Sequence, residues 1–522
     1  MAMKEDSQYL AYELQSRDAS PARGSGSAND TVDMARMGKQ QELRRNFRFF
    51  SIVGFVTILQ ATWESTLLAS SFGLYNGGTA GVIWCTIAVW LCIMAMISCM
   101  AEMASMAPTA GGQYHWVSEF SPPSVEKPLS YVVGWCCCLG WVSGIPACGQ
   151  LLTGLVQGMA LLLNPEANVG ALWQTTLLIF LFLILTFAFN IFLAKYLPLA
   201  EGVVLVVHTI GFFAFLLTLW VLSDHAPAKQ VFTQFEDGGG WGSIGLSTLV
   251  GLSTPLWCFI GPDAGAHMSE ELKDASLQLP RAMMWATLFN GIMGITMLIT
   301  FCFCVSNVDE VLNSATGVPI LDVVYKVTDS YAATCVLGTL LVILTFFSTV
   351  TVIAASSRQC WAFARDRGFP FSSWISQIQH GIPINALYVC FGVSAVLAAI
   401  NFGSDVALNA IVSVSNAALI FSYIVSIGCV GLKRLRGEAL LPRRFDLGRL
   451  GLPLNIVTML FLLISFVFSF FPVAPSVGDP TWAADFNWAI VMFGAVIMLA
   501  MGYYLGGGKH KYVPPVRLVK ND

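Results

Sequence analysis

The first long apolar segment of the chain contains polar side chains that could do chemistry. It includes the stretch Leu59-Gln60-Ala61-Thr62-Trp63-Glu64-Ser65. A carboxylate, an amide and a hydroxyl therefore stand where a membrane-spanning helix would otherwise be hydrocarbon. A charged side chain at the centre of a bilayer costs about 3 kcal/mol on insertion scales. That cost calls for an explanation, and it makes the stretch a candidate ligand site.

A second interrupted stretch occurs in the other half of the chain, at Gly261-Pro262-Asp263-Ala264-Gly265. Gly261 permits unusual backbone dihedrals and Pro262 removes a hydrogen-bond donor, so a helix should break here. A break exposes N–H groups that suit a carboxylate and C=O groups that suit an ammonium group. The first stretch has no glycine at its expected break, which disfavours a carboxylate cradle there.

Two residues of the first stretch have specific candidate roles. The Glu64 carboxylate can hold an amino group or face a quaternary ammonium, and Trp63 can supply a cation–π face. The alternative is that Glu64 pairs with a polar residue on a neighbouring helix and shapes the bundle. Asp263 has the same two interpretations, and it can also cap the half-helix that follows it.

A histidine and a glutamate in the fifth apolar segment are candidates for proton coupling. His208 lies two helical turns after Glu201, and a histidine titrates near physiological pH. The alternative is a neutral histidine hydrogen-bonded between helices. Glu64 and Asp263 complete the proton-coupling candidates. The predicted substrate-binding residues are Gln60, Thr62, Trp63, Glu64, Ser65, Trp141, Gly261, Pro262 and Asp263.

Composition fixes the elements that must position these residues. Of the 522 residues, 56% are hydrophobic and 11% are charged, against about 25% charged in soluble domains. Only helices or closed barrels cross a bilayer, so runs of about 20 apolar residues predict an all-α polytopic protein. Residues 1–46 are polar and predicted to be a disordered tail. The twelve predicted spans are 48–75, 79–100, 129–163, 172–194, 197–222, 245–267, 282–305, 332–356, 383–401, 406–431, 452–472 and 486–506.

The positions of the basic residues predict the orientation. With twelve spans and both ends in the cytosol, only Lys229 and Lys326 of the 27 lysines and arginines fall in outer loops. The other 25 fall inside, as the positive-inside rule requires. We therefore predict cytosolic tails at both ends, with residues 508–522 forming the second.

The sequence gives no support to several other classes of protein. Most of the 14 cysteines lie in apolar segments, without CxxC pairs or companion histidines, which fits buried hydrophobes better than a metal site. There is no nucleotide-binding loop and no nucleophile–base pair. We expect no enzyme activity, no cofactor, no metal and no nucleic-acid partner.

Several separated motifs resemble one family of membrane proteins. The segment 102–114, and Ser357-Arg358 followed by Ala364-Arg365-Asp366, are similar to signatures of the amino acid–polyamine–organocation superfamily. More narrowly, the chain resembles the fungal amino acid/choline permeases, which include GABA and choline carriers. The motifs behind this are Thr62-Trp63-Glu64, Asn76-Gly77-Gly78, Gly112-Gln113-Tyr114-His115-Trp116-Val117 and His267-Met268-Ser269-Glu270-Glu271.

The resemblance implies an inverted repeat of five plus five helices, with the first and sixth interrupted, followed by two extra helices. Within a transporter domain of 47–507, the repeats would cover about 47–222 and 245–431, and the extra helices 452–506. It also implies proton-coupled import of an amino acid, GABA or choline by alternating access, at a plasma membrane whose lipids surround the protein. A transport-inactive nutrient sensor and a polyamine carrier are the alternatives.

Two charged residues could form a gate at the inner mouth of such a carrier. Arg48 precedes the first span and Asp366 follows the eighth. We predict that they pair when the carrier faces outward and separate when it opens inward. The alternative is that these residues contact lipid and set the topology.

Overall fold

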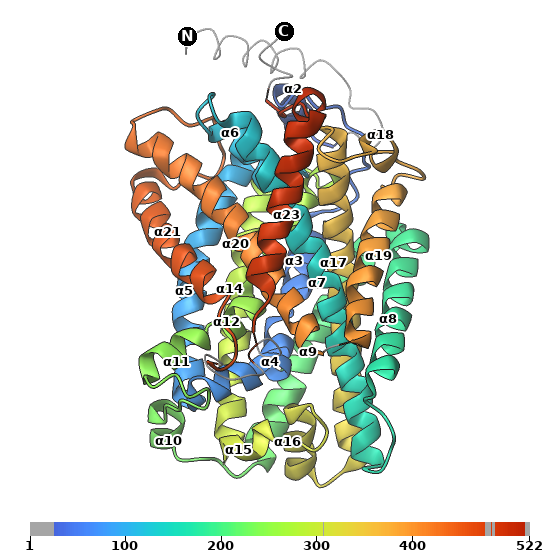
Figure 1. The fold of residues 1–522 in the computed structure, drawn as a ribbon, viewed down its shortest axis with the longest axis vertical. Helices are drawn as coiled ribbons and strands as arrows, with labels where there is room; N and C mark the ends of the chain where they lie inside the picture. Colours follow the sequence, from blue (N-terminus) through green and yellow to red (C-terminus); the bar gives the residue numbers. More distant parts are fainter. Residues whose placement is uncertain (1–25, 306, 404, 476–481, 483–485, 517–522) are drawn as a thin grey trace.

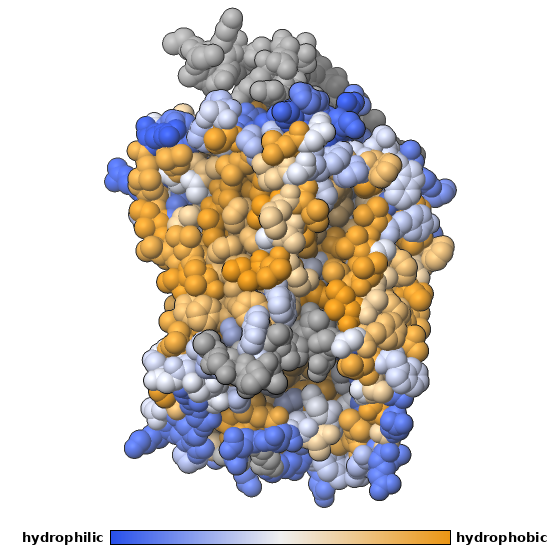
Figure 2. Space-filling view, in the orientation of Figure 1, coloured by the Kyte–Doolittle hydropathy of each residue, from blue (hydrophilic) through white to orange (hydrophobic). Residues whose placement is uncertain are grey.

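The computed structural model describes residues 26–305, 307–403, 405–475, 482 and 486–516. Within these residues, twelve helical spans are long and apolar enough to cross a membrane, as predicted. Figure 1 shows most of them running along the long axis of the molecule. Hydrophobic side chains cover the middle of the face seen in Figure 2, and hydrophilic ones gather at its two ends.

The twelve spans include four long helices of 30 residues or more and two interrupted ones. In chain order they are α3 (Phe49–Gln60) with α4 (Thr62–Tyr75), α5 (Gly78–Met106), α7 (Glu126–Leu163), α8 (Leu172–Phe192), α9 (Leu197–Leu222), α11 (Ile244–Val250) with α12 (Ser253–Phe259) and α13 (Ala264–His267), α14 (Ala275–Cys304), α17 (Tyr331–Arg365), α19 (Ile384–Ala399), α20 (Asp405–Leu435), α21 (Gly451–Phe468) and α23 (Ala489–Tyr503).

Shorter helices lie at the two ends of the bundle. Both ends of the described chain lie at one end, which we call the tail face, and we call the opposite end the loop face (Figure 1). The tail face carries α2 (Ala28–Arg36), α6 (Gln113–Phe120), the single turn η2 (Ser269–Glu271), α18 (Ser372–Ile375) and α24 (Lys509–Lys511). The loop face carries α10 (Ala228–Thr233), α15 (Val308–Leu312) and α16 (Pro319–Thr328).

The first and sixth spans are interrupted by different backbone devices. Ala61 joins α3 to α4 in the left-handed conformation, with φ 40° and ψ 49°, although no glycine is present. Gly261, between α12 and α13, has a φ of 99°, and Pro262 follows it. The half that follows the break lies towards the loop face in span 1 and towards the tail face in span 6. Spans 1 and 6 therefore cross the bundle in opposite directions, as the predicted inverted repeat requires.

The prediction of a disordered tail over residues 1–46 is wrong for residues 26–46. Helix α2 begins with a capping box between Ser27 and Asp30. The Asp30 carboxylate also accepts hydrogen bonds from the backbone N–H groups of Asp274 and Ala275, at 2.8 and 2.9 Å, and lies 3.2 Å from Arg45. The segment is polar because its charges pair with the bundle. Residues 1–25 lie outside the described part of the chain.

Candidate functional site

A cavity lies where the two interrupted spans meet. Its volume is about 680 Å³, including the solvent at its mouth. From the level of the breaks, Leu68 on α4, Leu151 on α7 and Thr345 on α17 extend its wall towards the loop face. The lining residues are Leu59, Gln60, Ala61, Ser65, Leu68, Gly140, Trp141, Gly144, Cys148, Leu151, Trp257, Ile260, Gly261, Thr345, Ser348, Val352, Ser415 and Leu419.

Side chains cross-link the two breaks around this cavity. The Gln60 amide donates to the carbonyl of Phe259, at the end of α12, over 2.9 Å. The Gln60 amide oxygen accepts from Asn290 on α14 at 3.1 Å. From α4, the Thr62 hydroxyl donates to the carbonyl of Cys258 at 3.2 Å. Gln60 and Thr62 therefore hold the two interrupted spans at a fixed separation.

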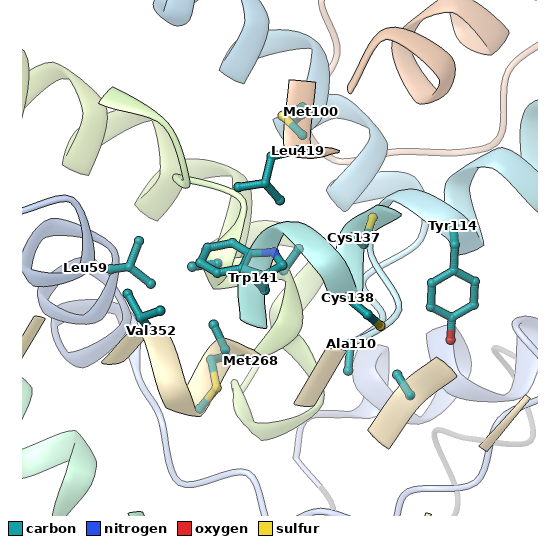
Figure 3. Packing of buried hydrophobic residues seen from close by; sticks show 14 of the residues in the cluster. Leu59, Met100, Ala110, Tyr114, Cys137, Cys138, Trp141, Met268, Val352 and Leu419 are labelled. Atoms are coloured by element: carbon teal, nitrogen blue, oxygen red, sulfur yellow. The ribbon is translucent and has the colours of Figure 1, made fainter. Parts of the chain in front are cut away.

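Among the described residues that form the cavity wall, none has a charged side chain. Its polar groups are amides, hydroxyls and the carbonyl ends of α3 and α12, and its aromatic groups are the indoles of Trp141 and Trp257. Figure 3 shows Leu59, Val352 and Leu419 around the Trp141 ring. A carbonyl oxygen has two lone pairs, so one that already accepts a protein hydrogen bond can accept a second from a ligand.

Four of the nine predicted binding residues line the cavity and five do not. Gln60, Ser65, Trp141 and Gly261 are in the wall. The residues outside it are Thr62, Trp63, Glu64, Pro262 and Asp263. The predicted binding residues that line the cavity are thus all uncharged.

Glu64 and Trp63, both predicted to bind substrate, do not line this cavity. Both side chains are buried on the side of α4 that packs against α9. The Glu64 carboxylate lies 2.6 Å from Nδ1 of His208. The Trp63 ring packs against His208 and Phe215, with centroids 5.8 and 5.5 Å apart. A helix positions residues by its rotation as well as its depth, and the sequence did not show which face of α4 met the cavity.

Asp263 lies just beyond the cavity, on the tail-face side of the break in span 6. Its oxygens accept hydrogen bonds from Gln113 Nε2 at 2.6 Å and from the Tyr423 hydroxyl at 2.5 Å. His267 Nε2 lies 3.7 Å away, one turn further along. The side chain makes no capping hydrogen bond on α13, so the alternative role as a helix cap is wrong.

Glu201 and His208 do not contact each other directly, although they share one face of α9. The Glu201 carboxylate accepts a hydrogen bond of 2.8 Å from the Thr351 hydroxyl on α17. His208 pairs with Glu64 instead. A direct step from Glu201 to His208 would need an intermediate group.

The tail face of the bundle is closed by ion pairs, but not by the predicted one. Arg48 is exposed, and the partner of Asp366 is Lys39, together with the Tyr114 hydroxyl at 2.9 Å. The predicted pair of Arg48 and Asp366 is therefore wrong in this conformation. Lys39 reaches Asp366 because the segment after α2 lies folded across this face.

Two further pairs join η2 to α17. The Glu270 carboxylate accepts hydrogen bonds of 2.7 and 2.8 Å from the two terminal nitrogens of Arg365. The Glu271 carboxylate accepts one of 2.8 Å from Arg358 Nε. Burial alone would raise the pKa of the Glu270 carboxyl, but Arg365, the backbone N–H of Ala110 and Lys39 together hold it below 4.5. Sequence reasoning missed these pairs and Lys39. The signal was present, since both glutamates lie in a motif singled out above.

Comparisons with known proteins agree with this architecture. A family model described as amino acid permease matches residues 47–496. The chain belongs to the amino acid permease family. The permease is 28% identical over 475 residues to the choline transporter of Saccharomyces cerevisiae, covering 90% of this chain and 83% of that protein.

A second relative and a solved structure extend the comparison. The permease is 31% identical over 443 residues to a Macrophomina phaseolina protein provisionally named an amino acid/polyamine transporter, covering 84% of this chain and 96% of that protein. A crystal structure of the manganese transporter of Eremococcus coleocola has a similar fold, with a TM-score of 0.53 and 14% identity, covering 91% of this chain and 95% of that one. The permease is thus a multi-pass membrane transporter of small organic substrates.

Proposed function

We propose that this permease carries a small molecule with one ammonium group, such as choline, GABA or a related amino acid. The observation that carries the proposal is the uncharged cavity with two indoles and two carbonyl-bearing helix ends. Indole faces attract an ammonium group by cation–π interaction, and the C-terminal ends of α3 and α12 present partial negative charge. A polyamine would need several spaced carboxylates, and the described wall has none.

Transport is coupled to protons through Glu64 and His208 in this proposal. The two residues share a hydrogen bond at the contact between α4 and α9, where a proton can move between carboxylate and imidazole. Their other polar atoms, Glu64 Oε2 and His208 Nε2, have no hydrogen-bond partner among the described residues. The pair can therefore take up a proton or a water without losing its existing bond. Glu201 and Asp263 remain predictions as coupling residues.

The transport cycle would be alternating access around the breaks. We place the tail face in the cytosol of a cell whose plasma membrane holds the permease, because its basic residues follow the positive-inside rule. In the described conformation the cavity wall extends towards the loop face, while three ion pairs close the tail face. Opening inward would break those pairs and separate η2 and the segment after α2 from α17.

Uptake of labelled choline, GABA and a panel of amino acids, with and without a proton gradient, tests the proposal. We expect one class of monovalent amine to accumulate, and Trp141→Ala to weaken its uptake more than Trp482→Ala, which alters an exposed tryptophan outside the cavity wall. We expect Glu64→Gln to abolish gradient-driven uptake at normal surface expression. Uptake that does not depend on the proton gradient would refute the coupling. Equal losses of uptake in Trp141→Ala and Trp482→Ala would refute the assignment of this cavity as the substrate site.

A further inference from the structure

We propose that Asp263 and His267 form a second proton-binding site, placed between the substrate cavity and the tail-face ion pairs. The inference rests on the proposed function, because a bound proton has a use here only if transport is coupled to protons. Both side chains are fully buried and lie one turn apart at the tail-face half of span 6. The ligand of the site is a proton taken from the loop-face side and released on the tail-face side.

The hydrogen bonds of His267 fix which of its nitrogens is free to bind an added proton. Nδ1 lies 2.9 Å from the carbonyl oxygen of Ala110. A carbonyl only accepts hydrogen bonds, so Nδ1 must carry a hydrogen. Nε2 then faces the Asp263 carboxylate at 3.7 Å and has no hydrogen-bond partner among the described residues.

The charge of this pair favours one added proton. A neutral His267 would present the lone pair of Nε2 to a buried carboxylate, which is repulsive. A proton on Nε2 turns that contact into an ion pair with no net charge, which a low-dielectric interior favours over an isolated carboxylate. The hydrogen bonds from Gln113 and Tyr423 keep Asp263 in place in both states.

The titratable groups around the pair are few. Tyr423 comes from α20, Cys137 from α7 and Cys360 from α17. On α6 the neighbour is the uncharged Gln113, and from α3 and α14 the residues nearest α13 at Gly265 are apolar. None of these groups brings a positive charge, so His267 supplies the proton-binding nitrogen that faces Asp263.

His267 also connects the cavity to the tail-face ion pair of Glu270 and Arg365. Its ring packs edge-to-face on Trp141, a cavity residue, with centroids 5.4 Å apart and an interplanar angle of 87°. The carbonyl of Ala110 accepts a hydrogen bond from His267 Nδ1. The backbone N–H of Ala110 donates a hydrogen bond of 3.2 Å to the Glu270 carboxylate. Glu270 in turn holds Arg365. A substrate that moves Trp141 would therefore disturb the proton site, and loss of the proton would loosen the peptide that supports the ion pair.

The first test observes the proton directly. The permease is labelled with ¹⁵N-histidine and placed in lipid nanodiscs, and the His267 signals, among the six histidines, are assigned from His267→Asn. Asn keeps a donor for the Ala110 carbonyl and removes Nε2. We expect Nδ1 to carry a hydrogen throughout, and Nε2 to hold an added proton in the wild type that Asp263→Asn, compared under the same conditions, does not hold. A neutral tautomer with the hydrogen on Nε2, or a proton on Nε2 that Asp263→Asn leaves in place, would overturn the site.

The second test separates this site from the proposed function. In proteoliposomes, a gradient of one pH unit should drive about tenfold accumulation of labelled choline or GABA, whichever the wild type carries, for one coupled proton. We expect His267→Asn to lose accumulation and retain counterflow exchange, which needs no net proton movement, while His510→Gln, at an exposed position, behaves as wild type. If the wild type does not accumulate substrate, the proposed coupling fails whatever the spectra show. If His267→Asn accumulates as well as wild type, the second site is refuted.

Discussion

The acids that follow the two helix breaks have very different surroundings. Glu64, in span 1, has one hydrogen-bond partner, His208 on span 5, and its second oxygen has none among the described residues. Asp263, in span 6, has both oxygens occupied, one of them by Tyr423 on span 10. Spans 1 and 6, and spans 5 and 10, are equivalent in the inverted repeat. An acid contacts the equivalent helix in both halves, but its partner is a histidine in the first half and a tyrosine in the second.

The comparison teaches which acid can respond to substrate. A carboxylate with two donors in place is held in one position, whereas a carboxylate with one donor can exchange partners at a smaller cost. We therefore expect Glu64 to change its pairing during transport and Asp263 to stay fixed, with His267 as the part of the second site that changes.

The largest effect on stability should come from removing His208, the one described hydrogen-bond partner of Glu64. His208→Leu leaves the Glu64 carboxylate buried without a partner, which we expect to lower the free energy of unfolding by about 3–5 kcal/mol. Thermal unfolding of the purified permease in detergent measures this. Adding Glu64→Leu should restore much of the loss, because no unpaired charge remains. A double variant as unstable as the single one would contradict this account of the pair.

Removing one partner of the better satisfied acid should cost less. Tyr423→Phe leaves Asp263 with Gln113 and His267, so we expect a loss of about 1.5–3 kcal/mol, the range for a hydrogen bond to a charged group. The same unfolding assay applies, with the exposed Tyr388→Phe as a control that should change little. A loss equal to that of His208→Leu would show that the two acids are not differently supported.

The two breaks should also differ in what they tolerate. Gly261→Ala places a Cβ 3.0 Å from Leu59 and 3.4 Å from Trp141 at a φ of 99°, so we expect a loss of about 1–2 kcal/mol and a narrower cavity. Ala61→Gly removes the left-handed strain of an alanine but adds freedom to the unfolded chain, so stability should change by less than about 1 kcal/mol. Substrate affinity and unfolding measured together would test this, and equal losses would contradict it.

The smallest effect is expected from pH on the tail-face ion pairs. Burial raises the pKa of Glu270, but Arg365, the N–H of Ala110 and Lys39 together lower it below 4.5, so the contribution of Glu270 to the tail-face ion pairs is fully present above 4.5. That contribution is lost only as pH falls through the lowered pKa. With His208→Gln and His267→Asn also in place, labelling of a Gln60→Cys variant from the tail-face side, corrected for the thiolate fraction at each pH, should therefore stay constant between about pH 6 and about pH 8. A change that persists in His208→Gln and His267→Asn would show that the gate itself titrates.

Sequence patterns predicted the scaffold well and the candidate site in part. The twelve spans, the break at Gly261 and the inverted repeat follow from hydropathy, local backbone chemistry and family motifs. Of the nine residues predicted to bind substrate, Gln60, Ser65, Trp141 and Gly261 line the cavity, and their role in binding stays a prediction. Asp366 was expected to pair with Arg48, but its ion-pair partner is Lys39, and its role in a gate stays a prediction. The folded segment 26–46 was missed because its composition is that of a disordered tail.

The membrane crossings and the helix breaks could be predicted from the amino-acid sequence, because burial in lipid and the loss of a backbone donor act on single segments. The contacts of Glu64 with His208 and of Asp263 with Tyr423, and the absence of charge from the described cavity wall, arise from the packing of the bundle. These outcomes depend on the rotation of each helix about its axis and on its neighbours, and they join residues more than a hundred positions apart. Polar groups in hydrocarbon must find partners, but the packing of the bundle chooses which ones.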